Sequence, residues 1–142
     1  MAPGVTGYGL TNSVFAVGGG STPTFGRAAK TSKHKMGTTF RYTLSEAATV
    51  RIVITQRGSG QRRGKRCAAP TRRLRHARRC TLIVTSGTLT RISHHGANGV
   101  GFSGRIGSKA LRPGRYQATL TATNAARQTS TRQTIAFTVV KG

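Results

Sequence analysis

The chain has 142 residues, of which 24 are Lys or Arg and only one, Glu46, is acidic, so its formal net charge is +23. Such an excess of positive charge attracts phosphates, sulfates and acidic polymers. A single carboxyl group also excludes chemistry that needs paired carboxylates, and we expect neither an enzyme nor a cofactor or metal site.

Residues 1–37 are rich in Gly, Thr and Ser and end in a basic stretch. This composition is typical of a linker, with one possible edge strand at residues 12–17. The first twenty residues lack the basic and apolar regions of a signal peptide. No stretch of the chain approaches 18 apolar residues, so no transmembrane helix is expected. We place one folded domain in residues 38–142.

From Thr38 onward the apolar residues recur at every second position, which predicts β-strands. The alternating runs lie at 40–44, 50–54, 82–84, 100–102, 116–122 and 135–139, with a further apolar residue at Leu89. Ser45-Glu46-Ala47 separates the first two runs and is predicted to be a turn. About seven strands with Gly-, Pro- or Ser-rich turns predict an all-β fold, an antiparallel sandwich of two sheets.

An Arg-rich segment separates the strand that ends near Arg57 from Cys80. It holds ten of the 24 basic residues, and we interpret it as a long hairpin insertion. Arginine binds phosphate and sulfate bidentately, so this segment is the candidate polyanion site. The candidate residues are Arg62, Arg63, Lys65, Arg66, Arg72, Arg73, Arg75, Arg78 and Arg79. Two alternatives stay open: a solvated loop without a ligand, or one or two helical turns over residues 71–79.

The segment contains no aromatic residue. Base stacking on single strands is therefore not expected, and contact with a nucleic acid would be to its backbone.

The two cysteines, Cys67 and Cys80, enclose twelve residues. They do not have the C-x-x-C spacing of a metal site. In a reducing compartment they would be free thiols, and in an oxidising one they would form a disulfide. We favour the disulfide, and with it a secreted or cell-surface protein.

Four histidines, at positions 34, 76, 94 and 95, are the plausible acid–base groups. A catalytic triad would need a carboxylate to orient one of them, and only Glu46 is present. The His94-His95 pair is interpreted as part of a solvated turn, which again argues against catalysis.

The run Leu111-Arg112-Pro113-Gly114-Arg115-Tyr116, followed by an alternating strand, resembles the tyrosine-corner region of immunoglobulin-like and fibronectin type III-like sandwiches. Together with residues 37–40, 44–50, 87–89, 96–98, 102–105 and the cysteine pair, it resembles an Ig-like module repeated in secreted and cell-surface proteins of actinobacteria. The resemblance covers roughly residues 11–140 and implies a fold and a location, but no catalytic residues. Relatives often carry Asp where Asn124 stands here, so no cation site is expected.

These observations predict a non-enzymatic, secreted or cell-surface module that adheres electrostatically to polyanions. Acidic polysaccharides, teichoic-type wall phosphates and the DNA backbone all have the required charge. One alternative is a structural repeat or subunit of a surface fibre, which would assemble by strand addition through its N-terminal segment. An intracellular nucleic-acid-binding protein is suggested by the pI near 12 but disfavoured by the cysteine spacing and the sandwich motifs.

Overall fold

A computed structural model describes residues 2–28, 37–69, 71–72 and 76–141. Among these residues the regular structure is β, and no helix is long and apolar enough to cross a membrane. The strands are β1 (Val5–Leu10), β2 (Val14–Ala16), β3 (Phe25–Arg27), β4 (Thr38–Leu44), β5 (Ala48–Arg63), β6 (Arg66–Ala68), β7 (Arg79–Ser93), β8 (Gly96–Phe102), β9 (Arg105–Ile106), β10 (Lys109–Ala110), β11 (Gly114–Thr123) and β12 (Gln133–Val140). The predicted all-β class is confirmed.

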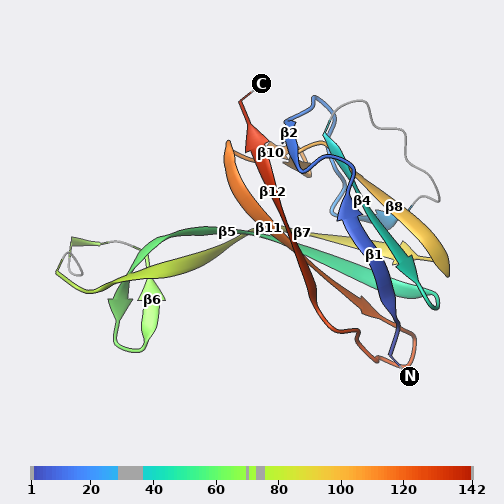
Figure 1. Cartoon of the computed structure of the whole chain (residues 1–142). Coiled ribbons are helices and arrows are strands. Elements are labelled where there is room, and N and C mark those ends of the chain that lie inside the picture. The colour runs from blue at the N-terminus through green and yellow to red at the C-terminus, as the bar shows by residue number, and fades with distance from the viewer. Residues whose placement is uncertain (1, 29–36, 70, 73–75, 142) are drawn as a thin grey trace.

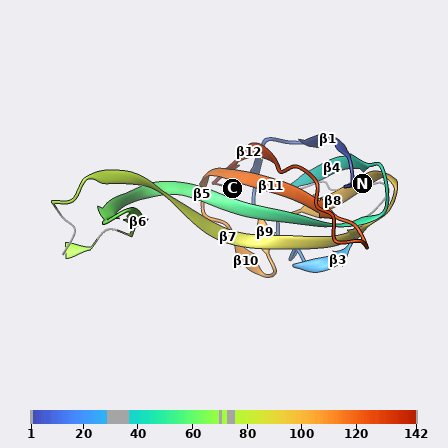
Figure 2. The same ribbon diagram turned by 90° about the horizontal axis from the view of Figure 1, so that it is seen from below.

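Two sheets pack against each other and form a sandwich (Figures 1 and 2). The smaller sheet has the strand order β1-β4-β8, and the larger has the order β2-β12-β11-β5-β7-β3, with β6 added beside β5. The chain passes from β4 to β5 through the predicted turn at residues 45–47. It returns to the smaller sheet through the short turn at His94 and His95. It crosses back to the larger sheet between β8 and β11, where β9 and β10 form a small separate hairpin.

The core lies between the inner faces of the two sheets. The alternation in β11 places Tyr116, Ala118, Leu120 and Ala122 inward, where all four are buried as predicted. Ile52 of β5 is fully buried in the same layer. Burial of an aliphatic or aromatic side chain contributes about 1.5–3 kcal/mol. The period-two pattern is therefore the main sequence determinant of this sandwich.

The segment before Thr38 supplies three strands where the sequence predicted one. The predicted edge strand at 12–17 is β2, which pairs in parallel with β12. Residues predicted to be linker form β1, antiparallel to β4, and β3, parallel to β7. The guanidinium of Arg91, which is buried, donates to the carbonyl oxygens of Pro23 (2.6 Å) and Thr90 (2.9 Å) and so ties the entry to β3 onto β7.

The prediction that a strand ends near Arg57 is wrong. β5 continues to Arg63, and β7 runs without interruption from Arg79 to Ser93. The two strands pair from Ala48↔Ser93 out to Gln61↔Arg79, so the predicted insertion is an extension of the sheet itself. The alternative prediction of helical turns over residues 71–79 is wrong at its C-terminal end, because Arg79 is the first residue of strand β7. Residues 73–75 of that alternative lie outside the described part of the chain.

Candidate polyanion-binding arm

The distal halves of β5 and β7 project from the sandwich as a twisted ribbon with β6 at its far end (Figure 1). We call residues 55–69 and 78–85 the arm. The pairs Thr55↔Thr85 and Gln61↔Arg79 mark its two ends on β5 and β7, and β6 pairs with the other side of β5. The arm is therefore a hydrogen-bonded structure along the length that the structure describes.

A β-bulge lies at the root of the arm. Ile54 is opposite Gly87, but the next residue, Thr55, is opposite Thr85, which leaves Ser86 as an extra residue on β7. Bulges bend a strand, increase its twist and turn a side chain in a new direction. This bulge lies where β5 changes from alternating buried apolar residues to mostly exposed ones.

The predicted disulfide is present and closes the far end of the arm. Cys67 of β6 and Cys80 of β7 have their Cα atoms 5.9 Å apart. Each is paired with β5, Cys67 with Arg62 and Cys80 with Gly60, so the bond passes over the strand between them. Gly60 makes room for it: a Cβ at this position would lie 2.6 Å from the Sγ of Cys67. The disulfide can therefore pass over β5 only because Gly60 has no side chain.

Opposite residues of an antiparallel pair direct their side chains to the same face. The pairs Arg57↔Ile83, Gln61↔Arg79 and Arg63↔Arg66 therefore share one face of the ribbon. We call the four arginines of this face, Arg57, Arg63, Arg66 and Arg79, the arginine face. All four are exposed. From Arg57 to Arg63 the face extends over about 20 Å, at ~3.3 Å per residue.

The other predicted site residues are distributed more widely. Arg62 is opposite Cys67 and so belongs to the disulfide side of the ribbon. Lys65 is in the turn between β5 and β6, and Arg72 and Arg78 are exposed near the tip. Arg73 and Arg75 lie outside the described residues. Arg57 belongs to the basic run of the sequence but was not among the predicted site residues. Its position on β5, opposite Ile83, places it on the arginine face.

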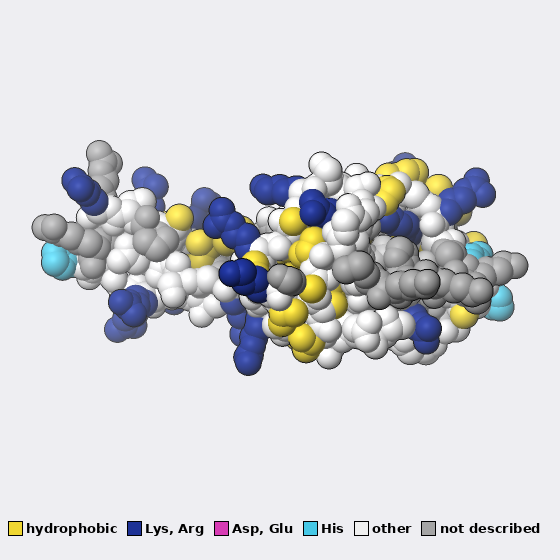
Figure 3. All heavy atoms as spheres, turned by 90° about the horizontal axis from the view of Figure 1, so that it is seen from above, with side chains coloured by type: hydrophobic (Ala, Val, Ile, Leu, Met, Phe, Trp, Pro, Cys, Tyr) yellow, Lys and Arg dark blue, Asp and Glu magenta, His cyan; other side chains and the backbone are white. Residues whose placement is uncertain are grey.

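Nothing in the arm neutralises this charge, because it contains no acidic residue. The chain's one acid, Glu46, is in the turn before β5, at the opposite end of that strand. Like charges directly opposite in a sheet destabilise the pair, and Arg63 faces Arg66 in this way. A bound anion between such residues would relieve the repulsion. Figure 3 shows Lys and Arg side chains along the arm and around its junction with the sandwich.

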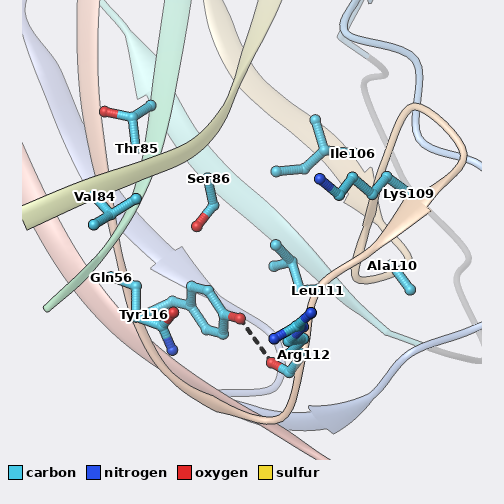
Figure 4. Close-up of a pocket in the computed structure, with 10 residues that line it drawn as sticks. All are labelled: Gln56, Val84, Thr85, Ser86, Ile106, Lys109, Ala110, Leu111, Arg112 and Tyr116. Carbon is cyan, nitrogen blue, oxygen red and sulfur yellow. Dashed lines mark hydrogen bonds between the residues drawn. The ribbon is translucent and has the colours of Figure 1, made fainter. Parts of the chain in front are cut away.

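A cavity of about 510 Å³ lies at this junction, and we call it the root pocket (Figure 4). One wall comes from β7 at residues 84–86, and the other from Ile106 and residues 109–112 of the β9–β10 hairpin and its exit. Gln56 and Tyr116 complete it. The hydroxyl of Tyr116 donates to the carbonyl oxygen of Arg112 at 2.7 Å, and burial raises the pKa of this phenol. No pattern in the sequence indicated this pocket, since its residues come from five separate strands and one loop.

The histidines of the described residues do not form a metal site with the cysteines or with Glu46. His94 is held in the turn between β7 and β8, where its ring nitrogen Nε2 lies 2.9 Å from the carbonyl oxygen of Ala97. The buried amide of Asn98 donates to the carbonyl oxygen of His94 at 2.8 Å. The contacts of His94 thus fit its predicted place in a turn.

The outward threonines of β11 and β12 form a polar sheet face. Thr119 and Thr134 are opposite each other, and their hydroxyl groups are 3.0 Å apart. This contact is ordinary cross-strand pairing.

Comparisons with family models, with curated proteins and with solved structures found no match to this chain.

Proposed function

We propose that this chain is a non-enzymatic, secreted or cell-surface binding module that adheres to polyanions through its arm. The observation that carries the proposal is the arginine face: four exposed guanidinium groups on one side of an ordered ribbon that contains no acid. Guanidinium groups bind phosphate, sulfate and carboxylate in a bidentate geometry. A face about 20 Å long, at ~3.3 Å per residue, is long enough to engage several repeating charges of a linear polymer at once.

The disulfide supports this function in two ways. In the chain-entropy model a bridge over a loop of this length contributes about 3 kcal/mol of stability. It also holds the strands before any ligand arrives, so less conformational entropy is lost on binding. Disulfides persist in oxidising environments, which supports a location outside the cytosol.

We further infer that the sandwich is Ig-like. β1, β4 and β8 in one sheet, with β5, β11 and β12 in the other, correspond to strands A, B, E and C, F, G of that fold. β7 lies beside β5, the position of strand C′ in variable-type domains. The hydrogen bond from Tyr116, at the start of β11, to the carbonyl oxygen of Arg112 supports a tyrosine corner.

The test compares two charge-matched variants with the wild-type chain. The arm variant replaces the arginine face: Arg57→Gln, Arg63→Gln, Arg66→Gln and Arg79→Gln. The control variant removes four exposed arginines from outside the arm: Arg41→Gln, Arg51→Gln, Arg115→Gln and Arg132→Gln. Binding to heparin, hyaluronate, polyphosphate and duplex DNA is measured at several salt concentrations.

We expect the arm variant to lose at least tenfold in affinity at physiological salt and the control to lose clearly less. For duplex DNA, the slope of log K against log salt should fall by about 0.9 for each phosphate contact removed. Equal losses in the two variants would mean that the charge acts diffusely, and the arm would not be the site.

Strand addition is the second candidate, and the edge of the larger sheet favours it. β2 is the last strand on that side, and its Val14 is 58% exposed. Light scattering without any polyanion tests this candidate: a fibre subunit should assemble by itself, and Val14→Lys should prevent assembly. A monomer at high concentration would contradict it.

A further inference from the structure

The root pocket combines three kinds of lining. Lys109 and Arg112 supply two cationic side chains, and no acidic residue is present to pair with them. Gln56 and Ser86 supply an amide and a hydroxyl group. Ile106, Leu111 and Val84 supply apolar surface. Its volume of about 510 Å³ is within the range of ~300–1,000 Å³ that small-molecule sites usually have.

Specific features of the backbone build this cavity. Gly87 lets the hairpin approach the sheet, because a Cβ there would lie 2.5 Å from Cδ1 of Ile106. Gly114 leaves space for the amide of Gln56, whose Nε2 would lie 2.8 Å from a Cβ at that position. The bulge in β7 adds Ser86, and Figure 4 shows its hydroxyl directed into the pocket. The walls of the pocket therefore depend on two glycines and one bulge.

We propose that the root pocket binds one uronate unit of an acidic polysaccharide; this inference rests on the proposed function and names its substrate class. The carboxylate would lie near Lys109 and Arg112, because these are the cationic groups of the pocket. The hydroxyl groups of the sugar would bond with Gln56 and Ser86, and its apolar C–H face would pack against Leu111 and Ile106.

The lining fits a uronate better than the simpler ligands. An inorganic anion would use the two cations but leave the apolar wall in contact with water. A neutral sugar would leave the cations without a partner. Gln56, Val84 and Thr85 of the pocket lining belong to the root of the arm. Gln56 and Arg57 are adjacent on β5 and direct their side chains to opposite faces, so a polymer with one unit in the pocket would reach the arginine face by passing around the edge of the ribbon. The pocket would give chemical selectivity, and the arginine face would give affinity.

The experiment follows backbone and side-chain amide signals of the ¹⁵N-labelled chain by NMR during titration with methyl β-D-glucuronide. Methyl β-D-glucoside tests the carboxylate, and glucose 6-phosphate tests a different anion on a similar ring. We expect saturable shifts at Ser86 and at the Gln56 side chain with the glucuronide. Lys109→Gln and Arg112→Gln should each raise its Kd about tenfold, which corresponds to about 1.4 kcal/mol.

Arg132→Gln is the matched control, since it removes one exposed charge away from the pocket and should leave the Kd unchanged. The arm variant separates the two proposals. Glucuronide binding that survives in the arm variant supports the pocket, whatever happens to polymer binding. Polymer binding without shifts at the pocket would overturn this inference and leave the proposed function standing. Equal binding of the glucoside, or binding of the sugar phosphate alone, would overturn the assignment to a uronate.

Discussion

Gly60 is the position where one added methyl group should do most damage to the arm. A Cβ there would lie 2.6 Å from Sγ of Cys67, 2.7 Å from the carbonyl oxygen of Ala68 and 3.0 Å from Cβ of Leu82. Two of these three atoms belong to β6, and all lie well inside normal contact distance. Gly60→Ala should therefore force β6 away from β5 or prevent the disulfide from closing.

The expected loss of stability in the arm can be estimated from the cost of overpacking and from the contribution of the disulfide, which are similar in size. Overpacking of a well-packed site costs about 1–3 kcal/mol, and the disulfide contributes about 3 kcal/mol. The substitution should thus remove most of the local stability that the bridge gives to the arm. The sandwich core contains neither Gly60 nor the cysteines, so the packing of the core should be unchanged.

Gly58 supplies the matched control on the same strand. A Cβ at Gly58 would meet only the carbonyl oxygen of Leu82, at 3.9 Å, which is ordinary contact. We would measure free thiols, the rate of disulfide reduction by dithiothreitol, and hydrogen exchange at the amide of Arg62, which donates to the carbonyl oxygen of Arg78 at 2.8 Å. Gly60→Ala should raise all three, and Gly58→Ala should not. Identical behaviour of the two variants would refute the argument that the disulfide needs the bare backbone of Gly60.

Three further predictions concern the sandwich. Tyr116→Phe removes the 2.7 Å hydrogen bond to Arg112 and should lower the free energy of unfolding by about 1 kcal/mol, measured by urea denaturation; an unchanged midpoint would contradict a structural role for the hydroxyl. Gly87→Ala places a Cβ 2.5 Å from Ile106 and should cost about 1–3 kcal/mol in the same assay, unlike Gly26→Ala, whose Cβ meets no atom within 4 Å. Burial raises the pKa values of Tyr8, Tyr42 and Tyr116, so the folded chain keeps protons that the unfolded chain releases near pH ~10. Stability should be unaffected by these groups below that pH and fall above it; because the chain has no Trp, absorbance at 295 nm follows the phenols directly, and titration of the folded chain near pH ~10 would refute the prediction.

The elements that the sequence predicted share a local signal. β11 alternates strictly from Tyr116 to Ala122, and that alternation specifies which face is buried. β1 has no such signal: Gly7 and Gly9 interrupt it, and the strand is defined by its partners, as in the pair Val5↔Leu44. An alternating pattern reveals strands that have one buried and one exposed face. It does not reveal strands such as β1, which form because a neighbouring strand provides backbone hydrogen-bond partners.

The candidate site divides in the same way. The basic run and the cysteine pair were visible as composition and spacing. The arginine face was not, because it depends on the registers Arg63↔Arg66 and Gln61↔Arg79, and the sequence did not indicate that β5 continues past Arg57. The root pocket was harder still to predict, since Gln56 of β5 and Lys109 of β10 are far apart in the sequence and belong to different sheets.

The position of the bulge connects the charge of the chain with its stability. Before Thr55, β5 alternates buried residues with exposed ones and belongs to the core; after it, nearly every side chain is in contact with solvent. Repulsion among exposed charges is weak in water and is screened further by salt. Arginines on a projecting ribbon therefore oppose folding much less than the same charges held against the sandwich would. The mutual repulsion that remains acts on the strands of the arm, and these are the strands that the disulfide holds together. An unusually basic chain can in this way keep an ordinary apolar core and still hold its charge on an ordered ribbon, as the proposed binding to polyanions requires.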